Sequence, residues 1–125
     1  MQSLLFSFKG RVNRARFWVA SILVSIVYDI ATVVVCGGIP AADEPGAVFE
    51  SIGPVRAIVM LILFIVLVWI GLALAVKRWH DRNKTGWWIL IVLIPVIGGL
   101  WYLIECGFLK GTAGPNRYGA DPLAA

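Results

Sequence analysis

The sequence predicts an all-α integral membrane protein, a bundle of three transmembrane helices, from three observations. The chain has 125 residues, of which 60% are hydrophobic and only 14% are charged, whereas soluble domains are about 45–50% apolar and about 25% charged. Three apolar stretches reach the roughly 20 residues that a helix needs to cross a bilayer. Basic residues gather beside only some ends of these stretches. Because so small a domain cannot bury this much apolar surface in its own core, lipid is the expected solvent.

The expected transmembrane helices cover residues 17–36, 57–76 and 87–108. The first contains one charge, Asp29, the second none, and the third only Glu105. Lipid offers no hydrogen-bond partners to the backbone, so each stretch is expected to be helical despite its many β-branched residues. The first stretch is longer than the apolar region of about 7–15 residues in a cleaved signal peptide, so we expect it to be retained.

Basic residues define the expected orientation. The loop 37–54 carries only acidic charges, and Arg56 stands at its far edge. Eight basic residues flank the other ends of the first two stretches: Lys9, Arg11, Arg14, Arg16, Lys77, Arg78, Arg82 and Lys84. We expect one membrane domain over residues 1–125 in a bacterial inner membrane. Basic loops stay in the cytoplasm, and this rule sets the expected orientation. The N-terminus and the basic loop 77–86 would be cytoplasmic, and loop 37–54 an outer connector without structure of its own.

The third stretch has two interpretations, because Pro95, Gly98 and Gly99 lie at its centre. The favoured one is a kinked spanning helix, which places the tail 109–125 outside the cytoplasm. The other is a re-entrant hairpin that returns the tail to the cytoplasm. In a straight helix Glu105 would lie about 27 Å above the cytoplasmic edge, near the outer interface.

A polar stripe follows one face of the first helix: Ser21, Ser25, Asp29, Thr32 and Cys36. An acid inside a membrane indicates an ion or proton path, which favours a small oligomeric transporter or channel-like protein. The simpler interpretation is that Asp29 is hydrogen-bonded and holds helices together, while the serines allow close approach. We favour the second.

His80 and Asp81 could serve as an acid–base pair in an enzyme at the membrane interface. The chain has no second histidine, so a metal site lacks ligands. The simpler interpretation is structural, with Asp81 paired to Arg78 or Arg82. We expect no catalytic residue, no cofactor and no metal. The basic clusters are tied to membrane edges and predict contact with anionic lipid headgroups rather than with nucleic acid.

Three segments carry a resemblance to a known family: FSFKGRVNRARFW (6–18), KRWHDRNKTGWW (77–88) and GTAGPNRYGADP (111–122). They resemble the signature segments of the domain of unknown function 805 family, small bacterial inner-membrane proteins. The resemblance implies a multi-pass inner-membrane protein and brings no reaction, substrate or cofactor. Asn83 stands where glycine is expected. If the third stretch is a hairpin, the three segments would meet on the cytoplasmic face.

The matching polar positions and the intramembrane acid are the candidate functional or interaction residues: Arg11, Asn13, Arg14, Asp29, Arg78, His80, Asp81, Asn116, Arg117 and Tyr118. The favoured function is a membrane scaffold or accessory protein that packs against a second copy or a larger membrane partner. The alternatives are the transporter with its polar path and the interface enzyme.

Overall fold

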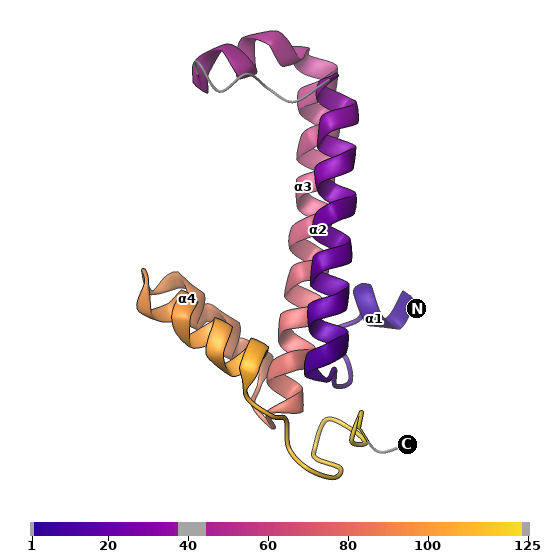
Figure 1. Ribbon diagram of the computed structural model, residues 1–125, viewed down its shortest axis with the longest axis vertical. Coiled ribbons are helices and arrows are strands. Elements are labelled where there is room, and N and C mark those ends of the chain that lie inside the picture. Colours follow the sequence, from indigo (N-terminus) through magenta and orange to yellow (C-terminus); the bar gives the residue numbers. More distant parts are fainter. Residues whose placement is uncertain (1, 38–44, 124–125) are drawn as a thin grey trace. The chain divides into compact units, whose positions relative to one another are not determined.

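The computed structural model describes residues 2–37 and 45–123, with side chains for residues 4–37 and 53–123. Every regular element there is helical, which confirms the all-α class (Figure 1). The elements are α1 (Gln2–Leu5), α2 (Arg14–Cys36), α3 (Pro45–Asp81), η1 (Gly86–Leu93), α4 (Ile97–Tyr102) and η2 (Leu103–Phe108). The chain forms two compact units, Met1–Ser21 with Trp69–Ala125, and Ile22–Val68.

The first two expected helices are present as α2 and as the Gly53–Asp81 part of α3. Both are long and apolar enough to cross a membrane. At about 1.5 Å per residue α2 measures about 34 Å, against a hydrocarbon thickness of about 30 Å. Only 6% of the apolar window of α2 and 17% of that of α3 are buried. These helices are therefore not the covered core of a soluble domain.

Asn13 caps the start of α2. Its side-chain oxygen accepts the Arg16 N–H at 2.8 Å, and its carbonyl oxygen accepts the Phe17 N–H at 2.9 Å. A cap of this kind satisfies N–H groups that have no partner within the helix. The helix therefore starts about one turn before the apolar stretch, and Phe17 and Ala20 bury their side chains on its inner face.

The first part of α3 differs from the expected unstructured loop 37–54. Residues 45–52 are helical, and Gly53 (φ 71°, ψ 161°) interrupts the helix before Pro54. Pro45 suits a first helical position, where its missing N–H has no partner to lose. The acidic side chains of this loop lie outside the described residues: Asp43, Glu44 and Glu50.

The third apolar stretch is a helical hairpin and not the single kinked helix that we favoured. The 3₁₀ helix η1 is followed by a reversal at residues 94–96, and α4 then lies beside η1 (Figure 1). Eight residues of 3₁₀ helix rise about 16 Å, and the twelve residues of α4 and η2 at most about 18 Å. Neither arm is long enough to cross about 30 Å of hydrocarbon.

Proline and glycine cause the reversal. Ile94 is extended (ψ 116°) because the ring of Pro95 disfavours a helical conformation in the residue before it. Val96 adopts φ 61° and ψ −62°, and the following N–H donates to the Pro95 carbonyl oxygen at 2.7 Å, which forms a γ-turn. A Cβ on Gly98 would overlap the carbonyl oxygen of Ile91. Glycine therefore lets the two arms of the hairpin approach closely.

Candidate functional site

The three signature segments meet at the end of α3, around a group we call the arginine cluster: Arg11, Arg78 and Asp81. The side chains of both arginines are 0–1% exposed and that of Asp81 is 5% exposed. Arg11 pairs with Oδ1 of Asp81 at 3.0 Å, and Arg78 pairs with Oδ2. Two buried guanidinium groups therefore share one carboxylate, and the cluster carries a net positive charge.

Arg11 joins the N-terminal segment to the tail. Beyond Asp81, its guanidinium donates to the carbonyl oxygens of Gly114 at 2.7 Å and of Thr112 at 2.6 Å. The backbone adds a second link, because the Thr112 N–H donates to the Asp81 carbonyl oxygen at 2.6 Å. Arginine suits this place because its planar fork offers five donors in fixed directions.

Arg78 joins the end of α3 to the hairpin. Its Nε donates to the Cys106 carbonyl oxygen at 2.6 Å and another guanidinium nitrogen donates to that of Leu109. A longer bond of 3.4 Å reaches the carbonyl oxygen of Val12. Arg78 thereby connects the last turn of α3 to the end of η2 and to the segment before α2.

His80 and Tyr118 bring the second and third signature segments together. Their rings stack with centroids 3.9 Å apart and planes 5° apart. Nδ1 of His80 lies 3.0 Å from the Gly10 carbonyl oxygen, and the Asn116 side chain donates to the His80 carbonyl oxygen at 2.9 Å. Arg117 lies over the Tyr118 ring, 5.1 Å from its centroid. The polar candidates of all three segments therefore converge at one place.

The described part of the tail, residues 109–123, thus contacts the N-terminal segment, whereas our favoured expectation places the two on opposite sides of the membrane. The tail is shaped by Asp121, whose oxygens accept the N–H groups of Gly114 at 2.8 Å and Leu123 at 2.9 Å. Hydrogen bonds from the backbone of Leu123 and Gly114 hold the pKa of Asp121 below its ordinary value. Their stabilising effect is present above the unfolded-state pKa and is lost as the pH falls through the lower folded-state value. We did not anticipate this role for Asp121.

One of the two expected pairings of Asp81 is present, and the other is replaced by an ion pair to Glu105. Asp81 pairs with Arg78, as one interpretation held, but Arg82 instead faces Glu105 at 3.4 Å. Lys84 also binds Glu105, at 2.7 Å. Glu105 was expected near the outer interface because a straight helix would carry it there. The hairpin returns it to the basic segment after α3.

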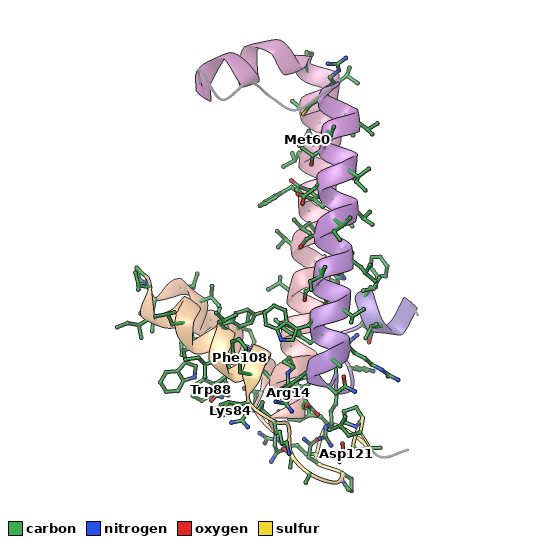
Figure 2. The ribbon with its side chains drawn as sticks, in the orientation of Figure 1. Arg14, Met60, Lys84, Trp88, Phe108 and Asp121 are labelled. Carbon is green, nitrogen blue, oxygen red and sulfur yellow. The ribbon has the colours of Figure 1, made fainter. Side chains whose placement is uncertain are left out.

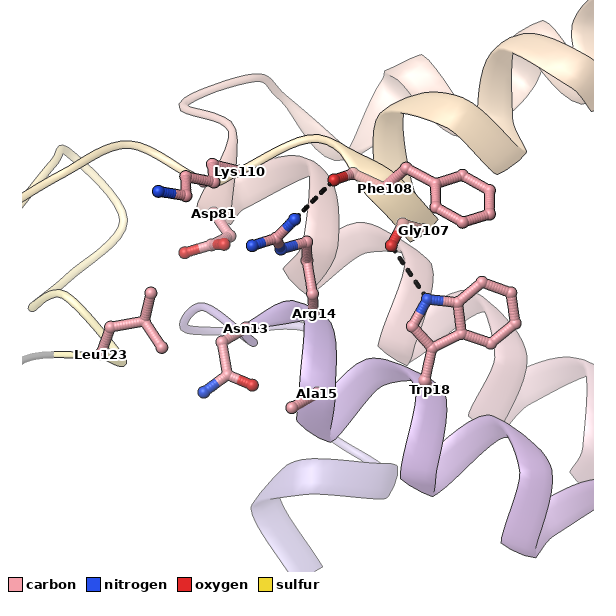
Figure 3. Close-up of a pocket in the computed structure, with 10 residues that line it drawn as sticks. Asn13, Arg14, Ala15, Trp18, Asp81, Gly107, Phe108, Lys110 and Leu123 are labelled. Atoms are coloured by element: carbon pink, nitrogen blue, oxygen red, sulfur yellow. Dashed lines mark hydrogen bonds between the residues drawn. The ribbon is translucent and has the colours of Figure 1, made fainter.

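Asn13 and Arg14 open onto a cavity of about 370 Å³. Arg14 donates to the Phe108 carbonyl oxygen at 2.7 Å, and the Trp18 indole N–H donates to that of Gly107 at 2.9 Å (Figure 3). These two bonds attach the start of α2 to the end of the hairpin. Figure 2 shows Arg14, Phe108 and Asp121 in the same region of the first unit.

Asp29 does not belong to the unit that holds this site; it belongs to the unit Ile22–Val68. Its side chain is exposed on α2. The Thr32 hydroxyl is buried and finds no hydrogen-bond partner among the described residues. Thr32 and Cys36 of the polar stripe belong to the same unit as Asp29.

Lys77 is a member of the site that sequence reasoning treated only as a topological charge. It is 2% exposed, and its ammonium group donates to the Leu4 carbonyl oxygen. Nearby, the Trp69 indole donates to the Phe6 carbonyl oxygen at 3.2 Å and packs edge-on against Phe8 at 4.9 Å. The alternation of aromatic and polar residues in FSFKG is the sequence feature that could have indicated this packing.

The arrangement is one of structural hydrogen bonds. His80 engages Gly10, and both oxygens of Asp81 engage arginines, so the two side chains are not oriented as an acid–base pair. Across residues 2–37 and 45–123, no three His, Cys, Asp or Glu side chains lie close enough to hold a metal ion. Asn83 has φ 57°, a left-handed conformation that explains why glycine is expected there.

Comparison with known proteins identifies the family of this chain. The family described as "Protein of unknown function (DUF805)" matches residues 5–120. Inner membrane protein YhaI of Escherichia coli is 30% identical over 92% of this chain and 85% of its own length, and inner membrane protein YhaH is 33% identical over 92% and 86%. The uncharacterized protein YiiR of the same organism is 28% identical over 97% and 89%. No solved structure matches. The apolar helices and these relatives support a place in a bacterial inner membrane, and the chain belongs to the DUF805 family.

Proposed function

We propose that this chain is a membrane-anchored interaction or accessory protein with no reaction of its own. In this proposal α2 and α3 cross the inner membrane, and the folded face built by the three signature segments contacts a second copy or a larger membrane protein. One observation carries the proposal: polar groups of these segments bind one another around Asp81 and His80, and this network supports a preformed contact surface. Rigid surfaces bind partners without a large ordering cost.

The proposed orientation follows from the arginine cluster. Arg11 precedes α2 and Arg78 lies in the last turn of α3. Both pair with Asp81, so the basic ends of the two long helices lie together. Basic flanks stay in the cytoplasm. The proposal therefore places the cluster, the N-terminal segment and the tail on the cytoplasmic side. The hairpin of η1 and α4 would enter the same leaflet, with its exposed apolar side chains in lipid.

A reporter fusion tests this orientation. Green fluorescent protein fused after Ala125 is expected to fluoresce, and alkaline phosphatase at the same point to be inactive, because the tail is cytoplasmic. The matched control is a fusion after Gly37, at the end of α2, which should give the opposite pair of signals. Active phosphatase after Ala125 would show that the tail is outside and would reject the proposed orientation.

Site-specific photo-crosslinking in living cells tests the interaction. Ala113 and Arg117 are exposed in the tail, and a photoreactive amino acid at either position is expected to give one discrete adduct. Val34, which is 73% exposed on α2, serves as the control position in the other unit. The adduct should vanish in an Asp81→Ala background, which removes the ion pairs that shape the face. A chain that stays monomeric without adducts from the tail would refute the proposal.

A further inference from the structure

The cavity of about 370 Å³ has a polar end and an apolar wall. Asn13, Arg14 and Lys110 line the polar end, and Trp18 and Phe108 line the wall (Figure 3). Along α2, Trp18 lies one helical turn beyond Arg14, so the lining changes from charged to aromatic over about 6 Å. The volume lies within the range of about 300–1,000 Å³ typical of small-molecule sites.

The charges around the cavity favour an anion. Arg14 donates one N–H group to the Phe108 carbonyl oxygen, and its remaining N–H groups meet no acceptor among the described residues. Lys110 is exposed at the rim. Asp81 also lines the cavity, but both of its oxygens are held by Arg11 and Arg78. The carboxylate is therefore more than neutralised, and the surroundings stay positive.

The aromatic wall selects among anions. A small inorganic anion would use only Arg14 and Lys110, whereas an amphiphile would also cover Trp18 and Phe108. Their rings lie 6.1 Å apart and tilted, a surface suited to the first carbons of an acyl chain. The backbone N–H groups at the start of the 23-residue helix α2 add to the positive field at the polar end.

We propose that this cavity binds the phosphate of an anionic phospholipid between Arg14 and Lys110, with the start of an acyl chain against Trp18 and Phe108. This site rests on the proposed function only in requiring the cavity to lie at the membrane surface. It would fix the depth of the folded face relative to the headgroups.

Native mass spectrometry of the full chain, released from detergent, tests the site. Phosphatidylglycerol is expected to be retained over phosphatidylcholine of the same chain length. The Arg14→Gln/Lys110→Gln variant should weaken phosphatidylglycerol binding about 30-fold. The matched control, Lys9→Gln/Arg16→Gln, removes two exposed basic residues that do not line the cavity and should change binding by less than about 2-fold. Equal loss in both variants would overturn the proposal.

Two further measurements distinguish a bound lipid from free phosphate. They also distinguish failure of this inference from failure of the proposed function. Ala15→Leu adds bulk at the cavity without changing charge and should also weaken phosphatidylglycerol binding. Inorganic phosphate at millimolar concentration should not displace the lipid; full displacement would indicate a free-phosphate site and overturn the lipid assignment. The tail photo-crosslinks and the reporter signals do not depend on this cavity. Lost lipid retention in the parent chain with those signals intact would refute this inference alone.

Discussion

Asp81→Ala is expected to lower the free energy of unfolding by about 3–5 kcal/mol, because it leaves two buried arginines without their shared counterion. Cys106 offers a direct readout. Its side chain is fully buried, and its carbonyl oxygen accepts a bond from Arg78. In a Cys36→Ser background, maleimide labelling of Cys106 should become at least about 100-fold faster as the cluster opens.

The control for this experiment is Asp29→Ala, which removes an acid that is exposed on α2. It should leave the labelling rate of Cys106 within about 2-fold of the parent, because surface changes away from buried networks have small effects. Asp81→Asn should fall between the two, since the amide keeps one acceptor oxygen but loses the charge. Equal labelling rates in all four proteins would show that Asp81 does not hold the cluster together.

The second large effect is expected at neighbouring glycines of the hairpin. Gly98→Ala should cost about 3 kcal/mol, because the new methyl group would overlap the backbone of Ile91 in the opposite arm. Gly99→Ala meets nothing within 4 Å and should be neutral or gain up to about 1 kcal/mol from helix propensity. Thermal unfolding in detergent, followed by circular dichroism, measures both.

This pair discriminates between the hairpin and a single helix. In a continuous helix over residues 87–108, alanine at either glycine would raise helix propensity by a similar amount. Both variants would then be at least as stable as the parent. That result would contradict the close contact between η1 and α4, whereas a loss confined to Gly98→Ala supports it.

The two long helices were predictable because hydropathy reports their physics directly. The stretch 57–76 has no charge, and its apolar side chains together make membrane insertion strongly favourable. The start of α2 was less visible, since it depends on the Asn13 cap rather than on apolar residues. The helical stretch 45–52 was missed because a Pro- and Gly-containing acidic segment reads as a loop.

The third stretch shows what hydropathy cannot decide. A window of about 20 apolar residues is the same for one crossing and for two short arms. Pro95 and Gly98 mark the break, but the choice between a kink and a reversal depends on the dihedral angles of Val96 and on contact with Ile91. The misplacement of Glu105 followed from the same straight-helix assumption.

At the site, the sequence predicts the ion pair within one helix but not the ion pair between distant segments. Arg78 and Asp81 are three residues apart on one helix, so their ion pair could be anticipated. Arg11 is 70 residues from Asp81, and no spacing rule connects them. The resemblance grouped the three segments, but only the structure shows that the arginines bind backbone carbonyl oxygens of the other segments.

Cross-linking of the second and third signature segments tests their convergence most directly. His80→Cys and Tyr118→Cys, introduced together into a chain with Cys36→Ser and Cys106→Ser, should form an intramolecular disulfide when isolated membranes are oxidised, since the native rings stack 3.9 Å apart. Peptide mass spectrometry after proteolysis would identify the bridge. Tyr118→Cys with Val96→Cys, at the exposed reversal of the hairpin, serves as the comparison pair. A bridge at 80–118 that exceeds the comparison pair is the predicted result. Its absence under oxidising conditions would contradict the convergence of these segments.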